Sequence, residues 1–315
     1  MEAIGGYFSL ELPSHGEFHQ GAIRLNTGRN CLEYILRVRK YRKVYIPYYT
    51  CEVILEPLRK LGIEYEFYHV NIKLEIAQKI KLQKDEALLY TNYFGLKQRY
   101  VEKLVDRYEN QLILDNTQAF YADHILDIDS FYTCRKFFGV PDGAYLYCDA
   151  ELDEEIAEDY SYERMAHLLK RIDLSAEEGY ADFRKVDDGL DNQPIRKMSK
   201  LTQRMMQSID YHAVALRRRE NYKILHKALG KDNNIVLPLG DDSVPMVYPY
   251  LVPKKGLRDK LIENKIFVAR YWPNVLEWAK PDDIDHLLAY QMQPLPIDQR
   301  YGIEEMKRIV DIIKR

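Results

Sequence analysis

The sequence predicts an α/β protein in which a mainly parallel sheet is covered by helices and followed by a smaller α/β unit. Three observations predict this fold. Short apolar segments alternate with amphipathic helical segments between residues 25 and 150, as parallel strands and their crossover helices do. Polar residues stand directly after several of these apolar segments. Beyond residue 150 the chain becomes more charged, and a polar connection at 185–195 precedes further strand and helix segments. We therefore expect a large domain at 1–195 and a small domain at 196–315.

The composition is that of an ordinary globular protein. The chain has 315 residues, of which 46% are hydrophobic and 30% are charged, enough for more than one minimal domain. Its formal net charge is only −3, so no global field attracts nucleic acid or an anionic membrane. We expect neither as a partner.

Targeting signals and cysteine spacing indicate a cytoplasmic protein. The N-terminal segment MEAIGGYFSLEL lacks a basic stretch followed by a long apolar core, so no signal peptide is predicted. No apolar run approaches the roughly 18 residues that span a bilayer. The four cysteines show neither a CxxC pair nor metal-ligand spacing, which favours reduced thiols.

The first elements are an irregular arm over residues 1–25, with a short strand near Tyr7–Leu12, and then a helix. The helix is predicted to start near Arg29 or Asn30, because apolar residues then recur on one face: Leu32, Ile35 and Leu36. Gly28 directly before it leaves room for a ligand at the free backbone N–H groups, as anion sites at helix N-termini require. A capped turn without a ligand is the other interpretation.

Several predicted strands end in polar residues. The strands are predicted at 44–47, 63–70, 88–90, 112–114 and 144–148, with helices at 52–61 and around 101–108. Thr50, Asn92 and Asp115 stand at strand ends, and Gly28 opens the first helix. Ligands of such sheets bind at the carboxyl ends of the strands, so we expect these residues to meet in one crevice.

The segment Gln111–Tyr147 carries the strongest chemical signal. Asp115 follows the apolar strand LIL, and an ionised carboxylate in such a place needs a partner. Gln118 comes three residues later, and Lys136 precedes a turn at Gly139–Gly143. An acid, an amide and a lysine at one sheet edge are suited to hold a heteroaromatic cofactor. An ordinary strand edge with surface charge is the alternative.

The C-terminal half contains further helices and strands. We predict charged helical structure at 151–178, a long helix at 198–229, strands at 244–251 and 266–271, and helices at 257–264, 282–290 and 303–313. The long helix carries the basic run Arg217–Arg219, which suits either an acidic substrate or a solvated surface. Arg270 and Tyr271 end a predicted strand, where a substrate carboxylate would be bound bidentately by the arginine or a structural ion pair would form.

Over nearly its whole length the chain resembles the fold-type-I enzymes that use pyridoxal 5′-phosphate (PLP), and specifically the DegT/DnrJ/StrS aminotransferases, which aminate keto-sugars. The resemblance is carried by short motifs spread along the chain: Thr27–Asn30, Ile46–Cys51, Asn92–Gly95, Leu114–Ala119, Ser130–Gly143 and Leu295–Ile297. It implies the aspartate-aminotransferase-like fold with a seven-stranded sheet. It also implies a homodimer with active sites at the subunit interface.

The resemblance implies a role for each matching residue. Lys136 would bind PLP covalently and later move a proton, and Asp115 would keep the pyridine nitrogen protonated. Gln118 would donate a hydrogen bond to the ring oxygen. The remaining cofactor contacts would come from backbone N–H groups, hydroxyls and a residue on the ring face: Gly28, Arg29, Ser130 or Thr133, and Thr50 or Cys51. Arg270 and Tyr271 would contact substrate.

The chain departs from the family pattern around the lysine. The family usually has a serine five residues before the cofactor-binding lysine. Five residues after Ser130 this chain has Arg135, whereas Thr133 stands three residues before Lys136. The family's GEGG is replaced by Val140–Gly143. Cys51 stands where an aromatic residue often lies on the ring. In the family, a neighbouring subunit lends an asparagine to the phosphate. In this chain its position would fall near Ile195, and Ser199 or Asn192 are weaker candidates for that role.

Three functional hypotheses follow. The leading one is a PLP-dependent aminotransferase that transfers an amino group from a glutamate-like donor to a keto-sugar, possibly nucleotide-linked. The altered lysine segment motivates the alternative, a catalytically silent PLP-fold binding or regulatory protein. A dehydrating enzyme of the same fold is disfavoured, because relatives of that type replace the lysine.

Overall fold

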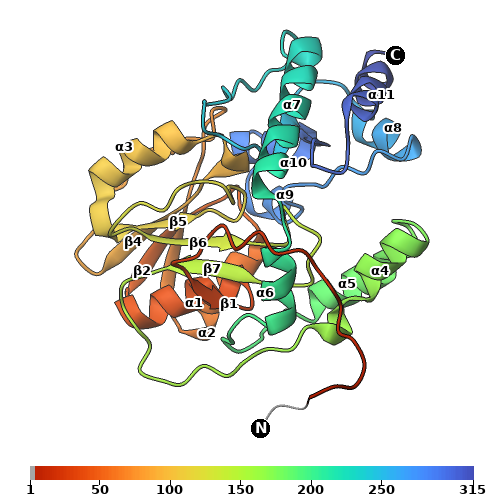
Figure 1. The fold of residues 1–315 in the computed structure, drawn as a ribbon. Helices are drawn as coiled ribbons and strands as arrows, with labels where there is room; N and C mark the ends of the chain where they lie inside the picture. Colours follow the sequence, from red (N-terminus) through yellow and green to blue (C-terminus); the bar gives the residue numbers. More distant parts are fainter. Residues whose placement is uncertain (1–3) are drawn as a thin grey trace.

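The computed structural model describes residues 4–315, and its larger part is built on a seven-stranded sheet (Figure 1). The strands are β1 (Ile23–Leu25), β2 (Lys43–Pro47), β3 (Glu64–Tyr68), β4 (Glu86–Thr91), β5 (Leu112–Asp115), β6 (Asp129–Thr133) and β7 (Ala144–Tyr147). Their order in space is β1-β7-β6-β5-β4-β2-β3. From β3 to β6 all neighbours are parallel, and β7 alone runs antiparallel between β6 and β1. The predicted mainly parallel sheet is confirmed.

The interior strand β4 is buried along its whole length, as expected of a strand covered on both faces. Its side chains alternate between two cores. Ala87 and Leu89 join an aliphatic core under α1 (Gly28–Arg39) and α2 (Leu55–Lys60). Leu88 and Tyr90 join a larger core, rich in tyrosine and phenylalanine, on the other face.

The second core is shared with the C-terminal part of the chain. That part consists of α7 (Tyr211–Leu229), α8 (Leu257–Glu263), α9 (Val275–Trp278), α10 (Ile284–Gln291), α11 (Ile303–Lys314) and a two-stranded antiparallel sheet of β8 (Val247–Tyr250) and β9 (Gln293–Pro296). Figure 1 shows these elements gathered over one side of the large sheet, and α3 (Gln98–Tyr108) packs on the same core. The division at residues 195 and 196 stays a prediction, because the two parts share this core.

Several predicted elements differ from the structure. The long helix predicted at 198–229 is two helices, α6 (Lys200–Gln207) and α7, because Asp210 caps Ala213 N–H at 2.9 Å and starts a new one. The segment 151–178, predicted to be helical, is largely irregular before α4 (Ala166–Asp173). The helix α5 (Tyr180–Asp188) extends into the connection predicted at 185–195. Residues 266–271 and 7–12 form no strand, since neither segment has a ladder partner.

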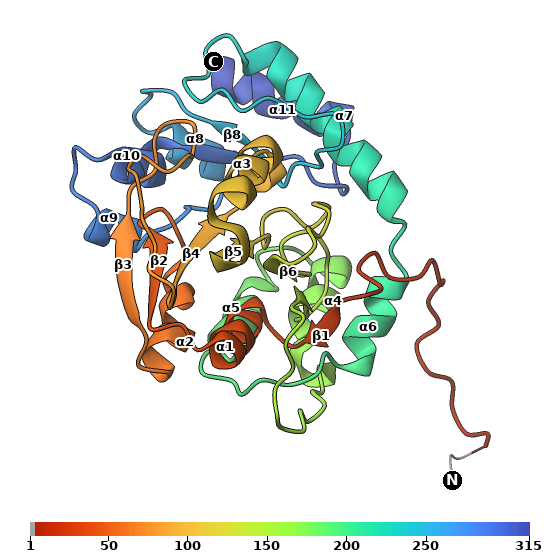
Figure 2. The same cartoon turned by 90° about the vertical axis from the view of Figure 1, so that its left-hand side faces the viewer.

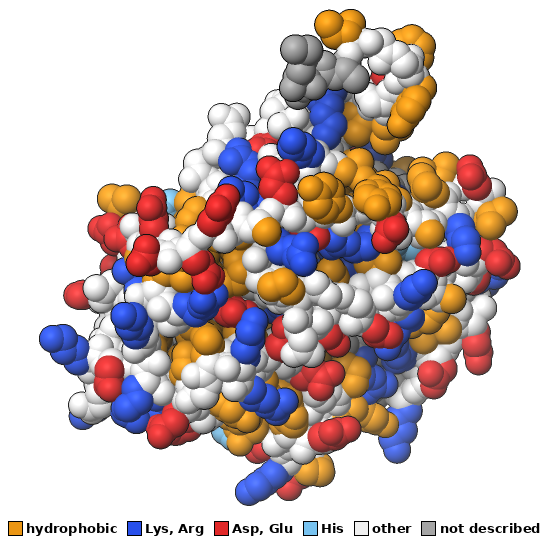
Figure 3. Space-filling view, turned by 90° about the horizontal axis from the view of Figure 1, so that it is seen from below, with side chains coloured by type: hydrophobic (Ala, Val, Ile, Leu, Met, Phe, Trp, Pro, Cys, Tyr) orange, Lys and Arg blue, Asp and Glu red, His pale blue; other side chains and the backbone are white. Residues whose placement is uncertain are grey.

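Two segments project from the body. The N-terminal arm runs away from it in both views, with apolar residues exposed from Ile4 to Leu10 (Figures 1 and 2). Residues 1–3 of the predicted arm lie outside the described range. The hairpin of α4 and α5 stands beside the C-terminal elements (Figure 1). Elsewhere, acidic and basic side chains are interspersed over the face seen from below (Figure 3), in keeping with the small net charge.

Within residues 4–315, none of the helices combines the length and the apolar character needed to cross a lipid bilayer.

Candidate functional site

Asp115 ends β5 at the carboxyl edge of the large sheet and is nearly fully buried. Its carboxylate accepts the Thr117 backbone N–H at 2.9 Å and the Thr91 hydroxyl at 3.3 Å. In the described part of the chain no Lys, Arg or His side chain forms an ion pair with it. A buried carboxylate held only by neutral donors is suited to bind a ligand that brings a positive N–H group.

Lys136 lies just beyond the end of β6, and Thr117 connects it to Asp115. The Lys136 ammonium Nζ donates to Thr117 Oγ1 at 2.9 Å, while the backbone of the same threonine donates to Asp115. Lys136 is exposed and forms no ion pair with any described residue. The structure therefore brings the predicted acid and lysine into one group. Thr117 was missed by the sequence argument, although it stands between Asp115 and Gln118.

Gln118 presents an unused donor to the same edge. Its Oε1 accepts the backbone N–H of Phe94 at 3.0 Å, which fixes the orientation of the amide. Its Nε2 is fully buried and has no hydrogen-bond partner. Leaving a buried donor unpaired costs about 1–3 kcal/mol, so this amide is oriented for an acceptor that the chain itself does not supply.

Gly28 is the first residue of α1, and it packs against Thr133. A Cβ built on it would lie 2.6 Å from Thr133 Cγ2 and 3.4 Å from Thr117 Cγ2, so only glycine permits this approach. The N–H groups of Gly28 and Arg29 lie in the first turn, which has no intrahelical acceptor. The Arg29 guanidinium is engaged with Glu56, at 2.7 Å, and with Asp191, so this residue offers the site its backbone alone.

The two predicted phosphate hydroxyls lie on opposite faces of β6, because three residues separate them. Thr133 faces the start of α1. Ser130 shares the other face with Tyr132, which belongs to the aromatic core, and its buried hydroxyl has no partner. Thr133 is thus beside the helix entry, and Ser130 is not.

Thr50 and Cys51 follow β2. Thr50 is buried and its carbonyl accepts the Asn274 side chain at 2.9 Å, so it connects to the C-terminal part. Burial raises the pKa of the Cys51 thiol, and the nearby charges of Lys136 and Arg29 oppose that rise.

The neighbours Arg270 and Tyr271 point in different directions. The Tyr271 ring packs on Phe94, with centroids 6.1 Å apart, and burial raises its pKa to about 12. The Arg270 guanidinium instead lies 5.8 Å from the ring centroid of Tyr290 in α10. The structure brings Tyr271 to the crevice and turns Arg270 away from it.

Arg218, the middle residue of the basic run in α7, is buried and forms hydrogen bonds to several segments near Lys136. Only 1% of it is exposed, and its guanidinium donates at 3.0 Å to the carbonyls of Phe137 and Met246 and to Gln299 Oε1. Burial lowers its pKa to about 10. It connects the backbone next to Lys136 with the C-terminal part. One of the two interpretations of Arg217–Arg219 from the sequence was a solvated helix surface. For Arg218 that interpretation is wrong, because the side chain is buried.

The turn at Val140–Gly143 is anchored through Asp142. This buried carboxylate accepts the hydroxyls of Thr202 and Ser161 at 2.5 Å and pairs with Arg164 at 2.7 Å. Ser199 caps α6, and its hydroxyl lies 2.6 Å from the Ser161 hydroxyl oxygen, so Ser199 already has partners within this network. The network holds the turn that follows Lys136.

The remaining residues named for the phosphate lie in structural positions. Ile195 packs in the aliphatic core, and the Asn192 backbone N–H donates to Glu56. Asn92, predicted at a strand end, donates to the Asn116 side-chain oxygen at 3.1 Å.

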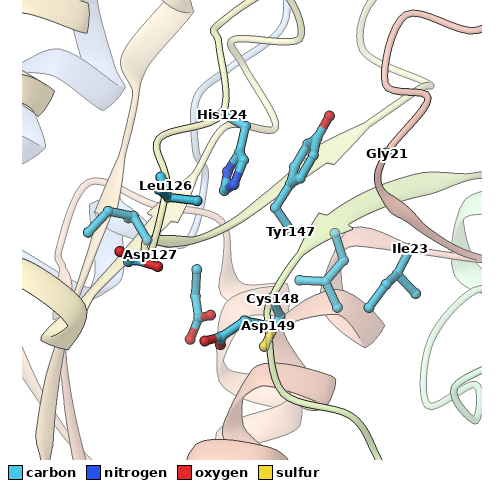
Figure 4. Close-up of a pocket in the computed structure, with 11 residues that line it drawn as sticks. Gly21, Ile23, His124, Leu126, Asp127, Tyr147, Cys148 and Asp149 are labelled. Atoms are coloured by element: carbon cyan, nitrogen blue, oxygen red, sulfur yellow. The ribbon is translucent and has the colours of Figure 1, made fainter.

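Two cavities lie at opposite ends of the sheet. The larger, of about 670 Å³, opens beside Lys136. The smaller, of about 160 Å³, lies at the amino end of β6, where Figure 4 shows His124 and Tyr147 side by side near Cys148 and Asp149. There Asp129, Cys148 and Asp149 place ligand atoms within 4.8 Å of one another. The Arg39 guanidinium donates to both carboxylates, so this cluster is an internal ion-pair network.

Comparison with known proteins identifies the fold. No protein-family model and no curated protein matches the chain. Solved structures do match, each aligning with 93% of it. They include DesV from S. venezuelae (15% identity, 84% of that chain, TM-score 0.64) and a DegT DnrJ EryC1 StrS aminotransferase from Brucella abortus (15%, 85%, 0.60). A third is NtdA from Bacillus subtilis with bound cofactor PMP (14%, 73%, 0.62). At such identities the likeness establishes the fold, and the predicted PLP-dependent aminotransferase fold is confirmed.

Proposed function

We propose that this protein is a PLP-dependent aminotransferase that acts on an amino acid donor, glutamate-like, and a keto-sugar acceptor. One observation carries the proposal. An unpaired buried carboxylate, an unpaired buried amide donor and a lysine meet at the carboxyl edge of the sheet, connected through Thr117. Structural neighbours with this fold include proteins that are aminotransferases by name, and two neighbours are described with PMP.

The residues present fit PLP group by group. Asp115 offers its carboxylate to a protonated ring nitrogen, and Gln118 Nε2 offers its free donor to a ring oxygen. The first turn of α1 and the Thr133 hydroxyl suit a phosphate, since helix N-termini favour anions. Tyr271 packs on Phe94, whose backbone N–H holds the Gln118 amide, and we propose Tyr271 and Cys51 as contacts on the cofactor ring. When bound, PLP supplies the electron sink that transamination needs.

The chain's own part in the chemistry centres on Lys136. Its amine would hold the cofactor and, once released, would move a proton at the substrate carbon. Thr117 orients Nζ at 2.9 Å, and Arg218 fixes the carbonyl of the adjacent Phe137. Positioning of this kind is required because a displacement of about 1 Å can cost about 100-fold in rate.

Assembly and location belong to the same proposal. We propose a homodimer with active sites at the interface, in the cytoplasm, with domains at 1–195 and 196–315. The exposed apolar residues of the N-terminal arm support a partner surface. Arg270 is kept as a substrate contact only if the small domain moves, because its guanidinium now packs on Tyr290.

The test is the visible absorption of the purified protein with PLP. We expect a band from the lysine-bound cofactor that is absent in Lys136→Ala and retained in Lys307→Ala, an exposed lysine of α11. A band that survives Lys136→Ala would refute the assignment of this lysine. A band that no amino acid donor changes would instead favour the catalytically silent binding protein.

A further inference from the structure

The cavity beside Lys136 is bounded mainly by three segments of the chain. Its floor is the segment from Arg135 to Val140, one wall is the α4–α5 hairpin, and the other is the loop 298–300 after β9. The hairpin contacts the floor directly, since Leu168 lies 3.9 Å from a Cβ built on Gly139. At about 670 Å³ the cavity is within the range of small-molecule sites, about 300–1,000 Å³.

The charges that line this cavity are strongly unbalanced. Five cationic side chains line it, and Asp298 is the one carboxylate among the lining residues: the cations are Arg135, Lys136, Arg171, Arg218 and Arg300. Asp298 is engaged by Arg300 at 2.7 Å. Asp187, behind the lining, takes Nη1 of Arg135 at 2.8 Å, while Nη2 of that guanidinium is buried without a partner.

Three of the five cations lack a carboxylate partner in the described chain. Arg171 forms no ion pair and no side-chain hydrogen bond there. Arg218 donates only to neutral carbonyl and amide oxygens, and Lys136 only to a hydroxyl. Of these three, Arg218 is buried, and an uncompensated buried charge costs several kcal/mol, so a ligand that supplies the counter-charge would be bound favourably. Arg171 and Lys136 are exposed, so such a ligand can contact them without displacing protein atoms.

The walls add an apolar component. Leu168, Ile172, Tyr180 and Phe183 line the hairpin side, and Phe137 and Phe138 line the floor. Tyr180 and Phe183 stack with ring centroids 6.3 Å apart. These surfaces suit the ring or methylene carbons of a ligand whose charged end reaches the arginines.

We propose that this cavity binds the anionic group of a substrate of the reaction at Lys136, with Arg171 as its specificity-determining contact. The inference rests on the proposed function, because it assigns the ligand by the cavity's place beside that lysine. The ligand chemistry is a phosphate or carboxylate on a small, partly apolar body. A phosphate would belong to the acceptor, and a carboxylate would belong to the amino acid donor.

The test titrates the full-length, PLP-loaded protein with pyrophosphate and, separately, with succinate by calorimetry. Whichever of the two probes binds, Arg171→Gln should weaken its affinity about tenfold, as expected for loss of one charge-assisted contact. The matched control is Arg184→Gln on α5, which pairs with Asp188 at 3.5 Å and does not line the cavity. It should change the affinity less than twofold. Equal losses in both variants, or no saturable binding, would overturn the proposal.

A second variant adds a charge without removing a contact. Ile172 is 81% exposed on the cavity wall, so Ile172→Glu should leave folding intact. The added carboxylate should repel an anionic probe in the cavity and weaken its binding about tenfold. An unchanged affinity in a folded Ile172→Glu variant would also count against the cavity.

The two probes distinguish the source of the anion. Pyrophosphate binding, with a raised KM for the acceptor in Arg171→Gln, would assign the cavity to the acceptor. Succinate binding, with a raised KM for the donor, would assign it to the donor.

The same titration on PLP-free protein separates this inference from the proposed function. Binding that depends on Arg171, in a protein that also develops no visible band when PLP is added, would refute the aminotransferase and support the anion cavity. A visible band without binding of either probe would refute the cavity alone.

Discussion

The two ends of the large sheet both carry carboxylates, cations and a cavity, but they differ in how the charges are paired. At the amino end, Arg39 engages Asp129 at 2.8 Å and also Asp149. At the carboxyl end, neither Asp115 nor Lys136 forms an ion pair with any described residue. The paired charges at the amino end stabilise the fold, whereas the unpaired charges at the carboxyl end are available to bind a ligand.

The difference has an energetic basis. A buried ion pair with good geometry offsets its desolvation internally, so the amino end needs nothing more. The carboxyl end keeps a buried carboxylate and the free Gln118 amide, each of which costs stability until a ligand binds. Such costs are typical of functional sites.

The largest expected effect comes from Asp115→Asn. The amide keeps an oxygen for the Thr117 N–H but cannot hold a proton on the cofactor ring. We expect turnover to fall by about 10³-fold, the scale of losing one electrostatic contact in a transition state. The measurement is steady-state kinetics beside chemical unfolding, where stability should change by less than about 1 kcal/mol. Normal turnover in this variant would remove Asp115 from the chemistry.

Acid should act on the amino end through His19. Its Nε2–H donates to the Phe120 carbonyl at 2.8 Å, and its Nδ1 accepts the Tyr147 hydroxyl at 3.2 Å. That tyrosine stacks on His124 of the small cavity. Burial lowers the pKa of His19 from 6.5 to about 4. Between pH 6.5 and 4 the unfolded chain therefore binds a proton at His19 that the folded protein does not bind. The contribution of neutral His19 to folding stability is present above pH 6.5 and is lost as the pH falls toward 4.

The expected loss between pH 6.5 and 4 is about 3 kcal/mol, since one pKa unit corresponds to about 1.4 kcal/mol. Urea unfolding across this range would measure it. His19→Gln should flatten the slope, and His212→Gln, an exposed histidine, should not. Identical slopes in all three proteins would show that His19 is not the group that titrates.

Asp129→Asn tests the amino end directly. Arg39 would lose its bidentate partner, and because Arg39 is 28% exposed we expect only about 2 kcal/mol of lost stability. PLP affinity should stay within twofold of wild type. A large fall in PLP affinity would break the distinction between the two ends.

The smallest expected effect is that of Gln118→Glu. The carboxylate keeps an acceptor for the Phe94 N–H but replaces the free Nε2 donor. PLP affinity should fall about tenfold, the equivalent of one hydrogen bond to a charged group. Gln203→Glu, which loses a donor to Met198 O away from the site, is the control. Equal PLP affinity in the two variants would leave the Gln118 amide without a role.

Much of the fold and the centre of the site could be predicted from local patterns. The alternation of apolar segments and helices between residues 25 and 150 predicted the parallel sheet, because periods of 2 and 3.6 residues are local properties. Asp115, Gln118, Lys136 and Gly28 were selected by their places at strand and helix ends. The structure brings all four to one edge of the sheet.

The sequence by itself determined which residues stand at the carboxyl edge, but only the tertiary structure decided which of them face one another. Thr133 lies beside Gly28 and Ser130 does not, because strand side chains alternate and the helix covers one face. Arg218 is buried under Phe137, and Tyr271 rather than Arg270 reaches the crevice, through packing between segments more than 80 residues apart in sequence. Charge pairing across such separations distinguishes the two ends of the sheet, and no local pattern encodes it.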